Sequence, residues 1–165
     1  MWCVWVIIRP IEKRDYGAFR RLFDEAYSEY LAPLKQKNPK QYLKERQTKM
    51  KITLPRFDFY LKTGSSFVAE EDGKVVGYVA SQTVNFMHGV DRLLWIEYIV
   101  VQQRFRRRGM GLALLRRLVE YAKLSGVGRV YTTINPDNKV SIDLHVKAGF
   151  DVKDWKIASY RIRKL

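Results

Sequence analysis

The sequence predicts a single α/β domain built on a mixed, mostly antiparallel, twisted sheet that helices flank. Short apolar runs with strand-like composition alternate with segments whose apolar residues recur at helical spacing. An Asp72-Gly73 pair joins two of the apolar runs, as in a tight hairpin. In the second half, strand-like and helical segments alternate, a pattern typical of helices covering a sheet. The length of 165 residues fits one domain, so we expect it to span residues 1–165.

The first third of the chain should form a strand and two helices, over residues 3–9, 15–31 and from 39 to near 55. The first helix is predicted because apolar residues recur every three to four positions. Proline has no amide hydrogen and clashes with the preceding turn, so Pro33 is expected to end this helix. The polar link over residues 33–39 is then the best candidate for a mobile loop.

The remaining segments are predicted to be mainly strands, with two further helices. Strands are expected at 66–70, 75–84, 93–101, 130–134, 150–157 and 158–162, and helices at 109–125 and 138–147. Gly73 supplies the positive φ that the first hairpin turn needs. Gly126 and Gly149 are placed to end the two helices. The count is about six to seven strands and about four helices.

Composition limits the class of protein. Apolar residues make up 47% of the chain, which is typical of a folded globular protein. The single cysteine, Cys3, excludes an internal disulfide framework and favours a reducing compartment. The apolar start, residues 1–8, is too short to span a bilayer. We therefore expect a cytoplasmic protein without a membrane partner.

The charge favours anionic partners. Lysine and arginine total 31 against 17 acidic residues, which gives a net charge of +14. Nucleic acid, acidic peptides and polyphosphate ligands all suit such a balance. The basic residues are dispersed, however, and this is more typical of a solvated surface than of a nucleic-acid groove. Nucleic-acid binding stays open as an alternative role.

The most informative segment is Arg106-Arg107-Arg108-Gly109-Met110-Gly111, here called the glycine loop. It lies between the apolar run 93–101 and the leucine-rich segment 112–124, an order that predicts strand, turn and helix. The first amides of a helix lack partners and carry the positive end of the helix dipole, so such a turn can bind phosphate. A tight turn with a solvated basic edge explains the segment equally well.

Three segments together resemble the GNAT superfamily, the acyl-CoA-dependent N-acetyltransferases. Residues 67–78 (FVAEEDGKVVGY) are similar to the family's central hairpin. Residues 101–111 (VQQRFRRRGMG) resemble its phosphate-binding signature, Gln/Arg-x-x-Gly-x-Gly/Ala. Residues 138–150 (NKVSIDLHVKAGF) resemble its later helix. Each motif is weak alone, but all three occur in the family's order and at its spacing.

The resemblance implies acetyl-CoA as co-substrate, with no metal. The family binds the pyrophosphate on the amides of the glycine turn, and the pantetheine arm pairs like an extra strand with the end of the fourth strand. The residues that match these contacts are Ile99, Val100, Val101, Arg106, Arg107, Arg108, Gly109, Met110, Gly111 and Leu112. Asn138 also matches a position that contacts the cofactor arm, although capping of the short helix explains an asparagine there equally well.

Two side chains are candidates for the chemistry. A neutral amine must attack the thioester, so some group has to accept a proton. Glu97 is the candidate base, because a carboxylate in an apolar strand is costly unless it faces a cleft or a partner. The alternative is a strand-edge glutamate paired with a lysine or arginine. His145 matches a position where the family usually has a tyrosine acid, so it is a candidate acid or a residue that lines the cofactor.

The sequence says least about the molecule that accepts the acetyl group. The resemblance places the acceptor site on the first two helices, where Tyr27 and Tyr30 are candidate substrate-binding residues, although core packing explains them at least as well. The predicted activity is acetyl transfer to a primary amine of a small molecule, peptide or protein, by direct attack in a ternary complex. The alternative is a basic binding module of the same fold, which holds CoA without turnover or binds nucleic acid or protein. A homodimer also stays open.

Overall fold

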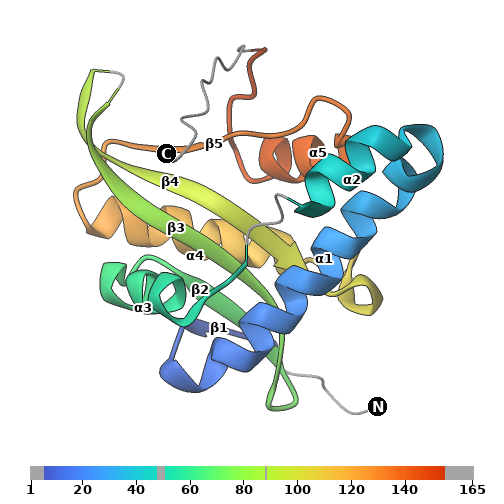
Figure 1. The fold of residues 1–165 in the computed structure, drawn as a ribbon. Helices are drawn as coiled ribbons and strands as arrows, with labels where there is room; N and C mark the ends of the chain where they lie inside the picture. Colours follow the sequence, from blue (N-terminus) through green and yellow to red (C-terminus); the bar gives the residue numbers. More distant parts are fainter. Residues whose placement is uncertain (1–5, 48–50, 88, 155–165) are drawn as a thin grey trace, which may run out of the picture. The chain divides into compact units, whose positions relative to one another are not determined.

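A computed structural model describes residues 6–47, 51–87 and 89–154 (Figure 1). The chain divides into two compact units, Met1–Thr133 and Ile134–Leu165. Whether the whole chain acts as one domain therefore remains a prediction, whereas the predicted α/β class is confirmed within the first unit.

The first unit contains five strands and four α-helices in its described part. In chain order these are β1 (Val6–Pro10), α1 (Tyr16–Lys37), α2 (Pro39–Gln47), α3 (Leu54–Thr63), β2 (Phe67–Glu71), β3 (Lys74–Met87), β4 (Val90–Val101), α4 (Met110–Leu124) and β5 (Arg129–Thr132). Short 3-10 turns precede α1, over Lys13–Asp15 (η1), and follow β4, over Gln103–Phe105 (η2).

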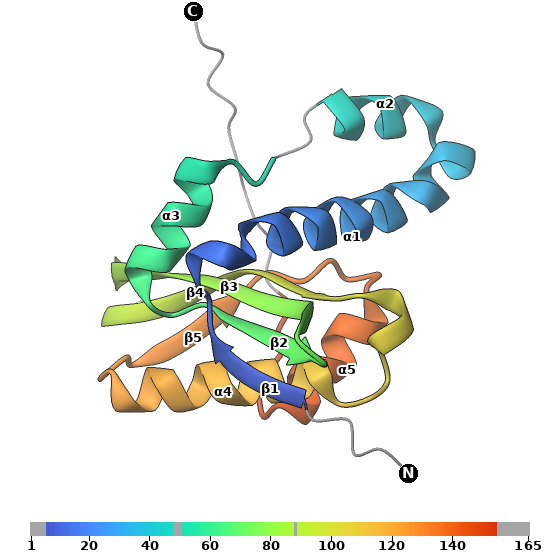
Figure 2. The same cartoon turned by 90° about the horizontal axis from the view of Figure 1, so that it is seen from below.

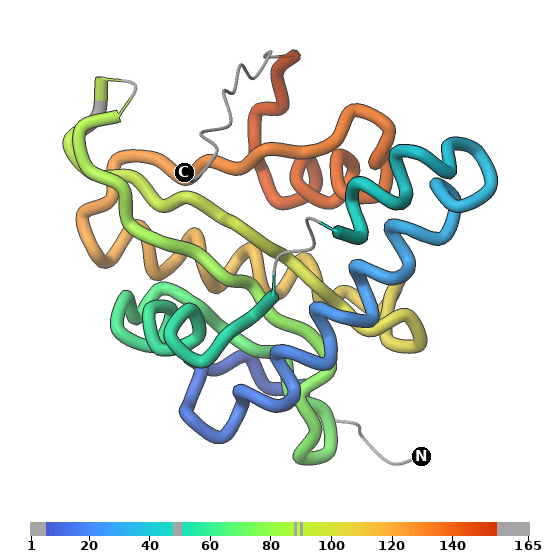
Figure 3. The backbone as a smooth tube through the Cα atoms, viewed as in Figure 1, coloured from blue at the N-terminus to red at the C-terminus, as the bar shows by residue number. Residues whose placement is uncertain are grey.

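The sheet has the strand order β1-β2-β3-β4-β5. The first four strands pair antiparallel, and β5 lies parallel to β4. β3 and β4 run side by side as one long hairpin (Figure 3). The mixed, mostly antiparallel sheet is as predicted, but it has five strands among the described residues, not six or seven. The expected strand 150–157 is absent over residues 150–154, and its remainder and the strand 158–162 lie outside the described residues.

Helices cover both faces of this sheet. Figure 2 shows α1 and α3 on one face and α4 on the other. The first face buries a cluster that includes Phe19, Phe57, Tyr60 and Tyr78, with Phe19 stacked on Tyr78 at 3.7 Å between ring centroids. On the second face, α4 buries its apolar stripe, which consists of Met110, Leu114, Leu115, Leu118 and Ala122. Because the sheet is buried on both faces, its strands are held rigidly beneath the helices.

The predicted break at Pro33 is wrong. α1 continues through this residue to Lys37, so residues 33–37 are helical and the expected loop is reduced to Asn38. Pro33 lies on the exposed side of the helix, whereas Leu31 is buried and Leu34 is half-buried. Packing of the apolar stripe thus continues past the missing amide hydrogen, which removes one backbone hydrogen bond without ending the helix.

The predicted second helix is also wrong in extent. α2 ends at Gln47 among the described residues, and a separate helix, α3, begins at Leu54. Pro55 stands in the first turn of α3, where an amide hydrogen would have no helical partner and its loss costs little. Gly64 ends α3 in the left-handed conformation, with φ +65°. Proline at the start and glycine just past the end were the signals for this helix.

The second unit contains α5 (Lys139–Lys147). Asn138 caps this helix, because its side-chain oxygen accepts a hydrogen bond from the amide of Ser141 at 3.1 Å. Gly149 follows the helix with φ +90°, a conformation that favours glycine. The predicted helix and both of its ends are thus confirmed.

An irregularity in the β3–β4 ladder lies at the candidate base. Ala80 pairs with Tyr98, and Ser81 pairs with Ile96, so Glu97 is the extra residue of a bulge in β4. Towards the end of the hairpin the two strands approach closely. A Cβ at Gly77 would stand 2.8 Å from the carbonyl oxygen of Val100. The bulge and this close contact fix the backbone position of residues 97–101, the last five of β4.

Candidate active site

Glu97 joins a polar cluster in the α3 face of the sheet. Its Oε2 accepts hydrogen bonds from the Tyr60 hydroxyl at 2.9 Å and from Nη2 of Arg56. Arg56 Nε also donates to the Tyr60 hydroxyl oxygen at 3.0 Å. The carboxylate side chain is 13% exposed, so these bonds form in a largely dry environment. The expected arginine partner of Glu97 therefore exists, and it comes from a helix that the sequence did not predict.

The bulge explains why Glu97 reaches α3. In a regular strand, successive side chains point to opposite faces, so Glu97 and Tyr98 would diverge. Instead, Arg56 contacts Glu97 and also lies over the Tyr98 ring, 5.8 Å from its centroid. Both side chains therefore point toward α3, as expected where an extra residue interrupts the alternation.

Tyr60 holds the carboxylate as a donor. Burial raises the pKa of the Tyr60 hydroxyl, and the hydrogen bond to Glu97 raises it further. The hydroxyl thus stays protonated at neutral pH and donates to Oε2 of Glu97. The described residues offer no hydrogen-bond partner to Oε1 of Glu97, so one carboxylate oxygen is still available to accept a proton.

Beyond the bulge, the outer edge of β4 pairs with no other strand of the described residues. β5 pairs with β4 only from Leu93 to Ile96, and the Thr132 hydroxyl bonds the Ile96 carbonyl at 3.2 Å. The Gln102 amide donates to Val76 of β3. Since backbone groups alternate in direction along a strand, the amides of Ile99 and Val101 point away from β3. These are the two positions predicted to pair with a pantetheine arm.

The glycine loop presents a row of unpaired amides at the start of α4. Within the described part of the chain, no group accepts from the backbone amides of residues 107–112, whereas the Ala113 amide already bonds the Gly109 carbonyl. Arg107 and Gly109 are left-handed, with φ +62° and φ +83°. A Cβ at Gly109 would meet nothing within 4 Å, so there is free space beside this residue. Such a row suits an anion.

The three arginines of the loop have different surroundings. Arg106 donates from Nε to the Val101 carbonyl at 2.8 Å and pairs through Nη2 with Glu29 at 2.5 Å. Arg108 pairs with Glu71. Arg107 is exposed and forms no ion pair with any described residue. The Val101 carbonyl therefore already accepts a hydrogen bond from Arg106. The Val101 amide donates to no group among the described residues.

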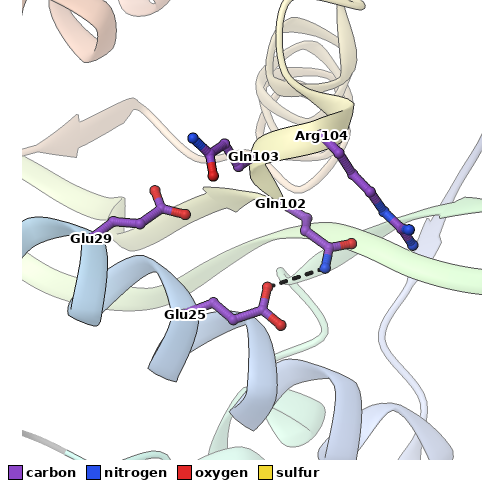
Figure 4. Close-up of a pocket in the computed structure, with 5 residues that line it drawn as sticks. All are labelled: Glu25, Glu29, Gln102, Gln103 and Arg104. Carbon is purple, nitrogen blue, oxygen red and sulfur yellow. Dashed lines mark hydrogen bonds between the residues drawn. The ribbon is translucent and has the colours of Figure 1, made fainter.

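A pocket of about 410 Å³ lies beside the segment that follows β4. Figure 4 shows its walls: Glu25 and Glu29 from α1 face Gln102, Gln103 and Arg104. Gln102 donates to Glu25 at 3.2 Å, which ties α1 to the end of β4. Glu25 pairs with Arg21 and Glu29 pairs with Arg106, and Arg104 also lines the pocket, so its two carboxylates are matched by neighbouring cations.

His145 is buried in α5 of the second unit, with 1% of its surface exposed. Its Nδ1 lies 2.8 Å from the Ser141 carbonyl oxygen, which requires a proton on Nδ1. Nε2 is buried and has no hydrogen-bond partner among the described residues. Burial lowers the pKa of His145, so the ring is neutral near pH 7 and Nε2 is an acceptor. A neutral ring with an acceptor Nε2 suits the cofactor-lining role better than the acid role, and both roles stay predictions.

His145 predicts a pH dependence of stability. Because its folded-state pKa lies below the ordinary value of about 6.5, the unfolded chain binds more protons as the pH falls through that value. The free energy of unfolding should therefore fall below pH 6.5, by up to about 1 kcal/mol per pH unit from this group. Urea unfolding of the wild type and His145→Phe at pH 8 and 5.5 checks this. An equal loss in both proteins would contradict it.

The candidate acceptor residues lie on α1. The Tyr27 hydroxyl donates to the Glu45 carbonyl at 2.9 Å and so connects α1 to α2, whereas Tyr30 is 46% exposed. Their substrate role stays a prediction. Sequence reasoning missed Arg56 and Tyr60, because it had no helix at α3, and it missed Glu71 as the partner of Arg108. The sequence shows that residues 67–74 contain glutamates, but it does not show that Glu71 pairs with Arg108.

Comparison with known proteins agrees with this architecture. Residues 19–150 match the acetyltransferase (GNAT) family. An uncharacterized N-acetyltransferase of Methanocaldococcus jannaschii is 31% identical over 151 residues, which cover 89% of this chain and 61% of that protein. An aminoglycoside N(6′)-acetyltransferase type 1 of Salmonella typhimurium is 28% identical over 102 residues, covering 60% and 70% of the two chains.

Solved structures share the fold. An aminoglycoside acetyltransferase from an uncultured soil metagenomic sample superposes with a TM-score of 0.69 at 17% identity, over 96% of this chain and 97% of that one. Glucosamine-6-phosphate N-acetyltransferase from Arabidopsis thaliana gives a TM-score of 0.66 at 21% identity, over 94% and 98%.

The chain belongs to the acetyltransferase (GNAT) family. It spans about three fifths of the length of the archaeal relative. In the part of the chain that the structure describes, no helix combines the length and apolar character needed to cross a membrane.

Proposed function

We propose that the chain is an acetyl-CoA-dependent N-acetyltransferase that acetylates a primary amine. The observation that carries this proposal is the row of amides at residues 107–112, none of which has an acceptor among the described residues. The row follows β4 and the short turn η2, and β5 does not pair with β4 from Glu97 onward. A phosphate site, a pairing edge and a carboxylate thus follow one another along a single strand and the loop after it.

Each part of this arrangement suits one part of the co-substrate. The amides of residues 107–112 would bind the pyrophosphate, with charge added by Arg107. The amides of Ile99 and Val101 would hold the pantetheine arm by strand-like hydrogen bonds. The thioester would then lie toward the bulge. Arg106 would have to release the Val101 carbonyl if the arm also uses that oxygen.

Glu97 would serve as the proton acceptor for the incoming amine. As the amine nitrogen forms its bond to the acetyl carbon and the carbon–sulfur bond breaks, the amine loses a proton and the thiolate leaves. Oε1 of Glu97 can take that proton directly or through water, while Tyr60 and Arg56 hold Oε2 in place. His145 would line the cofactor and accept a hydrogen bond through Nε2.

We infer that the acceptor is a small molecule with a primary amine. Support comes from relatives named for aminoglycosides, glucosamine 6-phosphate and L-2,4-diaminobutyric acid, all small amines. The positive net charge suits an anionic acceptor, whereas Glu25 and Glu29 in the pocket beside β4 would favour a cationic one only if it displaced their arginine partners. A peptide or protein amine is the second candidate.

A non-catalytic binding module is the alternative function. The pairing of Glu97 with Arg56 is compatible with it, because a carboxylate that serves only as an ion-pair partner would be held in the same way. In that case the chain would hold CoA without turnover, or bind nucleic acid through its positive charge. The two functions predict different results with acetyl-CoA.

Thermal unfolding with and without acetyl-CoA, followed by a free-thiol assay, tests the proposal. A ligand at 100 times its Kd adds about 2.7 kcal/mol to the free energy of unfolding, so the midpoint should rise clearly. Thiol release should then follow on at least one member of a panel of amino sugars, diamino acids and lysine peptides. Stabilisation without thiol release would favour the binding module. No stabilisation by acetyl-CoA, with stabilisation by duplex DNA, would refute the enzyme.

A further inference from the structure

A buried carboxylate lies beside the glycine loop. Glu71, the last residue of β2, is only 5% exposed. Both of its carboxylate oxygens accept hydrogen bonds from Arg108, which donates from Nη1 at 3.2 Å and also from Nη2. Arg108 immediately precedes Gly109, the N-cap of α4. A two-pronged ion pair therefore connects the end of β2 to the start of the helix that carries the unpaired amides.

This ion pair differs from the one that Arg106 makes in the burial of its carboxylate, since Arg108 itself is 45% exposed. Arg106 and Glu29 are each 39% exposed, and exposed pairs of this kind contribute little and exchange readily with other anions. Glu71, in contrast, would be left as a buried, uncompensated charge if Arg108 turned away, which is strongly unfavourable. Arg108 is thus committed to Glu71, whereas Arg107 has no ionic partner among the described residues.

We propose that Glu71 is a positioning residue for the glycine loop. Through Arg108 it fixes the loop to the β2–β3 hairpin, and Arg107, rather than Arg108, supplies the cationic contact to the cofactor phosphates. This inference rests on the proposed function, in which the loop binds CoA. The physical reason is preorganisation: a loop that must order itself on binding loses affinity, whereas one already held in its bound geometry does not.

The opposite assignment, with Arg108 as a phosphate ligand, predicts the opposite effect of Glu71→Gln on CoA affinity. If Arg108 were a phosphate ligand that Glu71 holds back, Glu71→Gln would release it and tighten CoA binding, while Arg108→Gln would weaken binding. If Glu71 positions the loop, both substitutions weaken binding. Each single variant should then raise the Kd for CoA about tenfold, and the double variant should raise it no further than either single one.

Calorimetric titration with CoA at several salt concentrations measures these effects. Arg107→Gln should weaken binding and also flatten its salt dependence, whereas Arg108→Gln should leave the salt dependence unchanged, because it removes no phosphate contact. In steady-state assays, Glu71→Gln should raise KM for acetyl-CoA and leave kcat unchanged. Unchanged or tighter CoA binding by Glu71→Gln would overturn the proposal.

Two controls separate this outcome from general damage. Glu120→Gln, on the same α4, removes an exposed carboxylate that pairs with Arg117 at 3.1 Å, and it should leave the Kd unchanged. If Arg108→Gln does not fold, because it leaves Glu71 as a buried lone charge, the double variant removes both partners and avoids that charge. A folded double variant that binds CoA like the wild type overturns the proposal. Wild type that fails to bind CoA refutes the proposed function itself, whereas normal wild-type binding with an unaffected Glu71→Gln refutes only the role of Glu71.

Discussion

Glu97→Gln should lower kcat by about 10²–10⁴-fold while KM for acetyl-CoA changes little, because a positioned general base contributes an effect of this size. The amide keeps the size of the side chain and can still accept from Tyr60, but it cannot take a proton. Activity should recover partly as the pH rises, since a larger share of the acceptor amine is then already neutral. Steady-state rates across pH 6.5–9.5 check this.

The ion pair with Arg56 demands a stability control for this variant. Removing one member of a partly buried pair destabilises the fold, so the unfolding midpoint should fall whichever role Glu97 has. Rates must therefore be taken well below that midpoint. Arg56→Gln serves as the matched variant, because it disrupts the same pair and keeps the carboxylate. A Glu97→Gln protein with a lowered midpoint but a wild-type kcat would assign Glu97 to structure alone.

Gly109→Ala should weaken CoA binding by roughly 5–30-fold, because a side chain makes the left-handed backbone at this position unfavourable by about 1–2 kcal/mol. With φ at +83°, Gly109 turns the chain at the start of α4, in the middle of the amides of residues 107–112. A residue with a Cβ would favour another conformation and turn some of these amides away. Calorimetric titration with CoA measures the loss.

Gly126→Ala provides the matched control for that substitution. Gly126 follows the other end of α4 and is also left-handed, at φ +65°, and a Cβ there would likewise meet nothing within 4 Å. Both variants should lose a similar free energy of unfolding, but only Gly109→Ala should lose CoA affinity. Equal CoA affinities in the two variants would show that the loop conformation does not matter for binding.

The sequence was informative wherever local patterns decide the structure. The Asp72-Gly73 turn and the α4 helix follow from turn chemistry and apolar spacing, and both are present as predicted. The start of α5 follows from the capping preference of Asn138. These features depend on neighbours within a few residues, so a single sequence contains the information.

The errors arose where tertiary packing overrides local preference. Pro33 lies within α1 because the apolar stripe on either side of it stays packed. The helix α3 was missed because Pro55 was interpreted as an end and not a start. This second error concealed the partners of Glu97, since both Arg56 and Tyr60 lie on α3.

The candidate site was predictable only in part for the same reason. The glycine loop and Glu97 stand out along the chain, but the ion pairs that hold them join residues 37 and 41 positions apart. Nothing in the local sequence indicates that Glu71 reaches Arg108 or that Arg56 reaches Glu97. Such pairs depend on how the sheet and its covering helices are arranged.

The central claim is that the amides of residues 107–112 hold the CoA pyrophosphate. Amide NMR of the 19.5 kDa chain, titrated with CoA, tests it most directly. We expect the largest shifts on residues 107–112, with smaller ones at Ile99 and Val101. Pantetheine, which has no phosphate, should leave the 107–112 amides unmoved. CoA binding that shifts amides elsewhere while those of residues 107–112 stay in place would contradict it.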